Sequence, residues 1–333
     1  MKSGFKRLIA VASANFKSCN AFPFVALVPF SVAITGVIYK YRLNCLLYEC
    51  CSSAVHFNKT SLERSLSDEL HGQHIAAERV YHHLVDHISG GLPQKPLALS
   101  FHGYTGVGKN FVSNIIANNV LKLGTRSRFY HFYDATIHFK HASHIPEYKE
   151  RLYRDLHTAV SECPTSIFVF DEMHNMPHGI LDILSPLLEV RETVEGVDFR
   201  KSIFIFLSNA GGNYINRRTY EHLVGGKKRE DLRYTDVDRF LAKSAFNNEG
   251  GLQYSELITK HLITAVIPFL PLQPTHVRKC VQDAAKRRNV TFSEDMVQFV
   301  LDELEWSPEG SKFFSVSGCK RVYEKVGFYL QQL

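Results

Sequence analysis

The apolar residues of positions 61–89 recur at the spacing that places side chains on one face of a helix. They are Leu62, Leu66, Leu70, Ile75, Val80, Leu84 and Ile88. The sequence Gly-Gly-Leu-Pro at positions 90–93 is typical of a turn and ends this pattern. The spacing therefore predicts one long helix at this point in the chain.

Short apolar segments with the composition of buried strands follow, and amphipathic segments separate them. The expected strands cover residues 97–102, 128–133, 167–170 and 203–207, and the expected helices cover residues 110–121, 147–161 and 179–190. Strands of this kind that alternate with helices indicate a parallel sheet with helices on both faces. The predicted fold class is therefore α/β.

The pattern changes at the sequence Pro-Phe-Leu-Pro of residues 268–271. Beyond it lie only segments with helical spacing, at residues 274–288, 293–304 and 318–330. We therefore expect a large α/β domain over residues 51–267, followed by a small helical domain over residues 268–333.

The N-terminal region has its own pattern of charge and apolar residues. Positive residues, among them Lys2 and Arg7, precede an uncharged stretch over residues 21–39. This arrangement predicts a signal peptide over residues 1–20 and an apolar membrane-associating segment over residues 21–50. Pro23 and Pro29 argue against a straight membrane-spanning helix. A buried helix of a soluble protein is the alternative.

The composition is that of a folded globular protein, with 45% hydrophobic and 22% charged residues. The net charge of +6 is mild for 333 residues, and no dense Lys/Arg run is interleaved with aromatic residues, so no nucleic-acid partner is expected. Asn58 and Asn289 begin Asn-x-Thr tripeptides that can accept a glycan in a secreted protein. Some of the seven cysteines would form disulfides in an oxidising compartment.

Residues 103–109 have the G-x-x-x-x-G-K form of a phosphate-binding loop between an expected strand and an expected helix. The glycines let backbone amides face phosphate oxygens, and the lysine would reach the terminal phosphates. The next residue is an asparagine in place of the usual hydroxyl residue, so its amide oxygen would hold Mg²⁺ directly or through water. The residues expected to bind a nucleotide here are Gly103, Tyr104, Thr105, Gly106, Val107, Gly108, Lys109, Asn110 and Phe111.

Polar side chains follow the next two expected strands. Asp171 would hold magnesium through water, and Glu172 would polarise an attacking water. Asn209 follows the strand over residues 203–207 and would hydrogen-bond the γ-phosphate or that water. Acids that merely cap a strand, and an asparagine that merely forms a turn, are the structural alternatives.

Together these segments resemble the AAA+ ATPases, and more closely their Clp-type branch. Residues 70–74 are similar to the box that lines the adenine site in that branch, which makes Gly72 and Gln73 candidate base-binding residues. The chain resembles the torsin family from about residue 30 to the end. The segments that carry this resemblance are residues 36–51, 103–112, 167–173, 206–211, 268–272 and 318–320. Asn110 after the loop lysine and Cys319 before Lys320 are torsin traits.

The resemblance implies an ATPase that binds ATP with Mg²⁺ and acts as a homo- or hetero-oligomer. It also implies a location in the lumen of the endoplasmic reticulum and the perinuclear space, with monotopic association with the membrane. Torsins are activated by luminal domains of nuclear-envelope and reticulum membrane proteins, and they remodel proteins or membranes there.

Two features of the site depend on this resemblance. Leu262 takes the place of the arginine that a neighbouring subunit contributes in Clp-type relatives, and losing such an arginine costs on the order of 10³–10⁵ in rate. Little hydrolysis is therefore expected unless a partner supplies the arginine. The alternative is that Arg217, Arg218 or Arg239 substitutes for it.

The second feature lies in the small domain. Lys320 is expected to contact the γ-phosphate, and a disulfide between Cys280 and Cys319 would fix its position, so that redox state affects nucleotide binding as in torsins. Two buried thiols or a purely structural bond are the alternatives. For the whole chain, the competing functions are a nucleotide-gated binding scaffold with little turnover and a general Clp-like chaperone.

Overall fold

The computed structural model describes residues 49–50, 57–238, 241 and 255–332. The predicted signal peptide, and all but the last two residues of the predicted membrane-associating segment, lie outside these residues. Within the described part of the chain, no helix has the length and apolar character needed to cross a membrane.

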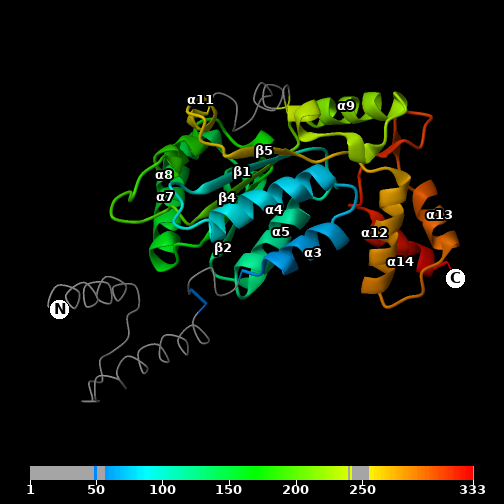
Figure 1. Cartoon of the computed structure of the whole chain (residues 1–333), viewed down its shortest axis with the longest axis horizontal. Coiled ribbons are helices and arrows are strands. Elements are labelled where there is room, and N and C mark those ends of the chain that lie inside the picture. Colours follow the sequence, from blue (N-terminus) through cyan, green and yellow to red (C-terminus); the bar gives the residue numbers. More distant parts are fainter. Residues whose placement is uncertain (1–48, 51–56, 239–240, 242–254, 333) are drawn as a thin grey trace, which may run out of the picture.

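A five-stranded parallel sheet forms the centre of the molecule (Figure 1). Its spatial order is β2-β3-β4-β1-β5, and every neighbouring pair is parallel. The strands are β1 (Leu97–His102), β2 (Tyr130–Asp134), β3 (Ile167–Asp171), β4 (Ile203–Ser208) and β5 (Ala265–Pro268). The predicted α/β class and parallel sheet are confirmed. The expected segment at residues 128–133 forms β2 with a shift of one to two residues, and β5 was not predicted because it overlaps the proline-rich segment.

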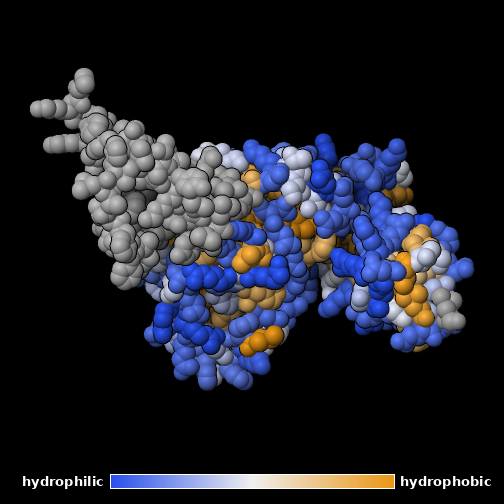
Figure 2. Space-filling model, turned by 90° about the horizontal axis from the view of Figure 1, so that it is seen from below, coloured by the Kyte–Doolittle hydropathy of each residue, from blue (hydrophilic) through white to orange (hydrophobic). Residues whose placement is uncertain are grey.

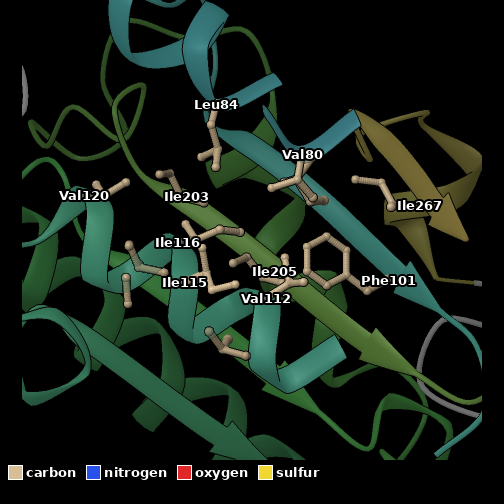
Figure 3. Packing of buried hydrophobic residues seen from close by; sticks show 14 of the residues in the cluster. Val80, Leu84, Phe101, Val112, Ile115, Ile116, Val120, Ile203, Ile205 and Ile267 are labelled. Carbon is tan, nitrogen blue, oxygen red and sulfur yellow. The ribbon is translucent and has the colours of Figure 1, made fainter. Parts of the chain in front are cut away.

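Helices cover both faces of the sheet, and alternate residues of each strand face opposite layers (Figure 1). One layer contains α3 (Lys59–Asp68), α4 (His74–Ser89) and α5 (Lys109–Val120). Figure 3 shows Val80 and Leu84 of this layer packed with Ile203 and Ile205 of β4. The other layer contains α7 (Ile145–Glu162), the 3-10 helix η6 (Ile180–Leu184) and α8 (Ser185–Leu188).

The prediction of a single helix over residues 61–89 is wrong. The chain turns between α3 and α4, where Gly72 has a φ of +68°. A side chain at Gly72 would collide with the ring of His276, so this turn brings the chain against the small domain. Residues 179–190 also differ from the prediction, since they form a 3-10 helix and one short α-helix that begins beside Pro186. Proline has no amide hydrogen with which to continue the preceding turns.

The C-terminal region has an apolar core of its own. It consists of α12 (Pro274–Arg287), α13 (Glu294–Asp302), α14 (Val322–Leu330) and the two-residue strands β6 (Trp306–Ser307) and β7 (Phe314–Ser315). The three helices were predicted, although α14 begins four residues later than expected. Figure 2 shows this part of the molecule projecting beyond the larger body.

The remaining elements of the described residues are mostly short. They are α6 (Ala135–His138), α9 (Gly212–Val224), α11 (Glu256–Thr259) and the 3-10 helices η3 (Gly124–Arg126), η4 (Ala142–His144), η5 (Met173–Asn175) and η7 (Arg229–Asp231). The sequence pattern did not predict α9, because this helix buries only Gly212, Ile215 and Thr219 and so lacks a wide apolar stripe. A disulfide joins Cys50 to Cys163, the residue that follows α7.

Candidate nucleotide site

The loop between β1 and α5 has the backbone conformation that its glycines predict. Gly106 and Gly108 have φ values of +73° and +109°, and α5 begins at Lys109. A side chain at Gly106 would collide with the carbonyl oxygen of Ser317. The loop therefore approaches the small domain closely while it leads into a 12-residue helix, whose N-terminal amides suit an anion.

Lys109 lies at the centre of this loop and is only 8% exposed. Its ammonium donates hydrogen bonds to the carbonyl oxygens of Gly103 (2.6 Å) and Tyr104 (2.8 Å) and to Oδ1 of Asn209 (2.8 Å). Burial lowers the pKa of Lys109 to about 8, although Asp171 and Glu172 act in the opposite direction. The loop thus holds a positive charge in a largely desolvated position.

The polar residues predicted at the strand ends meet beside this lysine. Because β3, β4 and β1 are neighbours in a parallel sheet, their carboxyl ends share one edge. Asn209 directly follows β4 and contacts Lys109, while the amide nitrogen of Asn110 donates a 2.7 Å hydrogen bond to Oδ2 of Asp171. An asparagine and an aspartate in contact offer oxygen atoms of the kind that Mg²⁺ prefers.

Glu172 follows Asp171 in a left-handed backbone conformation, with a φ of +56°. Its amide donates to Oδ1 of Asp171 at 2.8 Å, and its Oε2 lies 3.0 Å from Nε2 of His174 and 3.2 Å from Nδ2 of Asn175. This side chain therefore lies at the edge of the site and is held by the turn that follows β3.

The small domain forms the opposite wall of a pocket of about 520 Å³. The amide of Cys319 donates a 3.0 Å hydrogen bond to the carbonyl oxygen of Gly106, which joins this wall directly to the phosphate-loop glycine. Lys320 lines the pocket together with residues 105–111, Asp171, Glu172 and Asn209. The structure thus brings Lys320, which was predicted to contact the γ-phosphate, to the same pocket as the predicted phosphate-binding residues.

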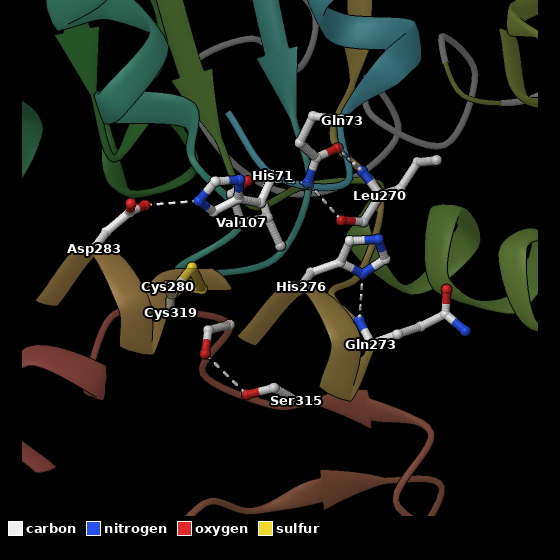
Figure 4. The surroundings of a disulfide bond; sticks show 11 residues. His71, Gln73, Val107, Leu270, Gln273, His276, Cys280, Asp283, Ser315 and Cys319 are labelled. Carbon is white, nitrogen blue, oxygen red and sulfur yellow. Dashed lines mark hydrogen bonds and ion pairs between the residues drawn. A yellow bond between two sulfur atoms is a disulfide. The ribbon is translucent and has the colours of Figure 1, made fainter. Parts of the chain in front are cut away.

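Gln73, which was predicted to contact the base, does not line the pocket. It is buried, and its amide donates to the carbonyl oxygens of Val107 (3.0 Å) and Leu270 (2.7 Å) and accepts from the Leu270 amide (2.7 Å; Figure 4). This side chain joins the loop before α4 to the phosphate loop and to the segment after β5. The neighbouring residues Leu70 and His71 line the pocket instead.

Gly72 is held from two sides. Arg229 donates two hydrogen bonds to its carbonyl oxygen, at 3.1 and 2.6 Å, and the His276 ring lies against its α-carbon. Burial lowers the pKa of Arg229 to about 10. His71 joins the two domains, since its Nε2 lies 2.6 Å from Oδ2 of Asp283 on α12 (Figure 4).

Cys280 and Cys319 form a disulfide with a Cα–Cα distance of 6.1 Å (Figure 4). Cys280 lies on α12, in the same helix as Asp283, and Cys319 precedes Lys320. Both cysteines line the pocket. The bond therefore joins α12 to the segment that carries Lys320.

The position predicted for a missing arginine is deeply buried. Leu262 is 6% exposed and packs in the apolar cluster beneath the sheet. Arg217 and Arg218 lie on α9, where both pair with Glu221, and Arg239 is outside the described residues. Which of these arginines, if any, acts in hydrolysis stays a prediction.

The two predicted glycosylation sites are on the surface. Asn58 caps α3, and it uses Oδ1 for this purpose rather than the amide nitrogen to which a glycan is attached. Asn289 follows α12 and is also exposed. Both positions are sterically compatible with the prediction, which itself stays a prediction.

Sequence reasoning overlooked two polar residues of the site. Asp134 ends β2, in register with Asp171, and lines the pocket. The rule that the carboxyl ends of parallel strands gather polar groups identifies this residue once the sheet order is known. His174 lies between Glu172 and Asn209, and a single histidine two residues after an acid gives no signal of its own.

Comparisons with known proteins agree with this geometry. Residues 45–170 match the family model described as Torsin, and residues 272–329 match the one described as Torsin-1A, C-terminal domain. A Caenorhabditis elegans protein named Torsin-like protein is 44% identical over 298 residues, which cover 88% of this chain and 84% of that protein.

Solved structures show the same fold at low sequence identity. A chain of the S. cerevisiae Hsp104-ADP complex superimposes with a TM-score of 0.56 and 17% identity, covering 90% of this chain and 49% of that chain. A chain of Hsp104 with ATPγS and FITC casein, in a closed state, superimposes with a TM-score of 0.57 and 17% identity, covering 82% of this chain and 46% of that chain. This chain thus spans about half the length of the Hsp104 chains that it matches. From the family models and the Caenorhabditis elegans relative together, we conclude that the chain belongs to the torsin family of AAA+ ATPases.

Proposed function

We propose that this protein binds ATP with Mg²⁺ in the pocket between its two domains and hydrolyses it when a luminal activator supplies an arginine. It would do so in the lumen of the endoplasmic reticulum and the perinuclear space, associated with the membrane and as a homo- or hetero-oligomer. The work obtained from hydrolysis would remodel proteins or membranes at the nuclear envelope.

The residues around the pocket fit a nucleotide with its metal ion. A glycine loop whose conformation excludes side chains leads into a helix N-terminus, and a buried lysine carries positive charge there. Asp171 and Asn110 would hold Mg²⁺, directly or through water, and the ion would neutralise charge on the phosphates. Because the Asn110 amide nitrogen contacts Asp171, ligation by the Asn110 oxygen requires this amide to turn.

Dependence on an activator rests on Leu262. A side chain that is 6% exposed within an apolar cluster cannot reach a neighbouring subunit's nucleotide, and leucine carries no charge to stabilise a transition state. Glu172 and Lys109 would still position water and phosphate, so binding would remain while hydrolysis is slow. The buried leucine at position 262 is therefore the observation on which the proposed activator dependence rests.

The luminal location is supported by two disulfides. Cys50–Cys163 and Cys280–Cys319 both join elements distant in sequence, with separations of 113 and 39 residues. Such bonds persist in oxidising compartments and are rare in the cytosol. Glycosylation of Asn58 or Asn289, tested by Asn→Gln variants in microsomes with protease protection, would support this location; an unprotected, unglycosylated chain would contradict it.

The function is tested by an ATPase assay of the full-length chain in mild detergent, with and without luminal domains of nuclear-envelope and reticulum membrane proteins. We expect the chain without a partner to bind ATP and hardly hydrolyse it. With an activating domain, turnover should be on the order of 10³-fold faster than without it. A variant of that domain in which the activating arginine is replaced by alanine should bind the chain without stimulating hydrolysis. Fast turnover by the chain alone would refute the activator requirement.

A nucleotide-gated scaffold is the second candidate, and the Asn110–Asp171 contact favours it because Mg²⁺ must displace this hydrogen bond. Glu172→Gln separates the two candidates in cells that lack the wild-type protein. Loss of function together with a trapped partner complex supports the enzyme. Retained function supports the scaffold.

A further inference from the structure

His174 lies in the turn that follows β3, within η5, and contacts residues from two different strand ends. Its Nε2 lies 3.0 Å from Oε2 of Glu172. On the other side, the backbone amide of Asn209 lies 3.5 Å from Nδ1, and Nδ2 of Asn209 lies 3.4 Å from Nε2. The imidazole is therefore placed between the carboxylate expected to activate water and the asparagine expected to sense the γ-phosphate.

The contacts of His174 with the Asn209 backbone amide and with the Glu172 carboxylate are consistent with one arrangement of the ring proton, whereas the Nδ2 atoms of Asn175 and Asn209, each 3.4 Å from Nε2, are donors and take no part in it. The Asn209 amide can only donate, so Nδ1 accepts from it and Nε2 carries the proton. The proton on Nε2 then points to the Glu172 carboxylate, which can only accept when ionised. An imidazole with its proton on Nε2 and its acceptor at Nδ1 thus satisfies both neighbours and joins them.

The contacts extend to the phosphate loop. Nδ2 of Asn209 can only donate, so it does not hydrogen-bond to a protonated Nε2, and the backbone amide of Asn209 is what links this residue to His174. The Asn209 side chain accepts a 2.8 Å hydrogen bond from Lys109, so Glu172, His174, Asn209 and Lys109 form a continuous series of polar contacts. The side chains of His174 and Glu172 are 26% and 37% exposed, which leaves these contacts only partly screened by water. A shift of Asn209 toward a phosphate would therefore be transmitted to the Glu172 carboxylate.

We propose that His174 is a positioning residue that couples γ-phosphate recognition by Asn209 to the orientation of Glu172. The inference rests on the proposed function, since it assigns no role to His174 in the absence of ATP. With ADP, no γ-phosphate reaches Asn209 and the coupling has no effect. His174 should therefore matter for ATP and not for ADP.

The test measures the binding of fluorescent mant-ATP and mant-ADP to the full-length chain. His174→Phe keeps a ring of similar size and removes both hydrogen-bonding atoms. We expect the dissociation constant for ATP to rise about fivefold to tenfold and that for ADP to change less than about twofold, as the loss of one net hydrogen bond predicts. His174→Gln, whose amide both donates and accepts, should restore ATP binding to within about twofold.

The matched control is His178→Phe, an exposed histidine four residues further along the chain and outside η5, which should change neither constant. Equal weakening of ATP and ADP binding in His174→Phe would overturn the inference, because it would mean that the histidine only supports the turn. Unchanged ATP binding would overturn it as well. If His174→Phe does not fold, His174→Ala is judged by the same two constants. Failure of the wild-type chain to bind either nucleotide would instead refute the proposed function, and the inference with it.

Discussion

The two walls of the nucleotide pocket are held in place in different ways. The large-domain wall stands on the ends of β1, β3 and β4, whose residues are almost all fully buried between two helical layers. The small-domain wall touches it through a few polar contacts. These include the Cys319 amide on Gly106 and the pair formed by His71 and Asp283.

This difference indicates a division of roles. Residues that must act on phosphate and water lie on the wall that is fixed by the central sheet, where small displacements are costly because the core is densely packed. The position of the small-domain wall, which includes Lys320, depends on polar contacts with the large-domain wall that are worth about 1 kcal/mol each. We therefore expect changes in the large-domain wall to alter chemistry, and changes in the small-domain wall to alter affinity and local stability.

The largest effect should come from Glu172→Gln in the large-domain wall. Removing the carboxylate that activates water should lower the activator-stimulated hydrolysis rate by about 10²–10⁴-fold while ATP still binds. The measurement is single-turnover hydrolysis, with ATP affinity determined in parallel. Glu150→Gln, on the exposed surface of α7, is the control and should behave like the wild type. A Glu172→Gln variant that hydrolyses ATP normally would remove Glu172 from the site.

The next largest effect should come from the small-domain wall, in a variant with both Cys280→Ser and Cys319→Ser. The bond closes a loop of 39 residues, so its loss should lower the free energy of unfolding of the helical region by roughly 2–4 kcal/mol. ATP affinity should fall, whereas the stimulated rate at saturating ATP should not. Denaturant unfolding and nucleotide titration measure the two effects.

The matched control removes the other disulfide by Cys50→Ser and Cys163→Ser. That bond lies away from the pocket, so its loss should destabilise the large domain without changing ATP affinity. If the two double variants weakened ATP binding equally, the disulfide at the pocket would have no special relation to the nucleotide.

A third effect depends on pH and concerns the buried support of the large-domain wall. His102 at the end of β1 donates a hydrogen bond from Nδ1 to the Ala210 carbonyl oxygen and accepts one at Nε2 from the Ser100 hydroxyl, and burial lowers its pKa to about 4. In the unfolded chain its pKa is near 6.5, so between pH 6.5 and 4 only the unfolded state binds the proton. Stability contributed by this group is therefore present above pH 6.5 and is lost as pH falls toward 4, by up to about 3 kcal/mol.

The measurement is the urea midpoint of the wild type and of His102→Gln from pH 7 to pH 4. The variant should be less stable at pH 7 and should lose less stability on acidification, because it lacks the titrating group. Other histidines with a lowered pKa, such as the half-buried His276 with a pKa of about 3, titrate in both proteins and cancel in the comparison. Parallel curves for the two proteins would show that His102 does not carry this pH dependence.

The sequence predicted the large-domain wall better than the small-domain wall. Lys109, Asp171 and Asn209 each follow a strongly apolar strand, and parallel strands bring their ends together whatever the loops between them do. The hydrogen bonds of Gln73 to backbone groups were not predicted, because the sequence does not tell whether a polar side chain contacts a ligand or the backbone. The turn at Gly72 was missed because apolar residues continue at nearly helical spacing on both sides of it.

Contacts between distant segments explain what else was missed. His174 acquires its position only when β3 and β4 lie side by side, and Asp134 only when β2 is placed next to β3. Neither residue belongs to a periodic pattern or a short motif. The Cys280–Cys319 pairing was expected from the family resemblance and not from the spacing of the cysteines. Among seven cysteines, each has several possible partners, and the sequence alone does not select one.

The smallest predicted effect tests whether the small-domain wall depends on single polar contacts. Asp283→Ala removes the partner of His71, and because the Asp283 side chain is 46% exposed, we expect the loss to be only about 0.5–1 kcal/mol. ATP affinity should therefore fall about twofold to fivefold, with no change in the stimulated rate at saturating ATP. Gln282→Ala, at an exposed position of the same helix, controls for the change in helix propensity. A lowered rate at saturating ATP in Asp283→Ala would mean that the small-domain wall also takes part in the chemistry, and the division of roles between the two walls would then be wrong.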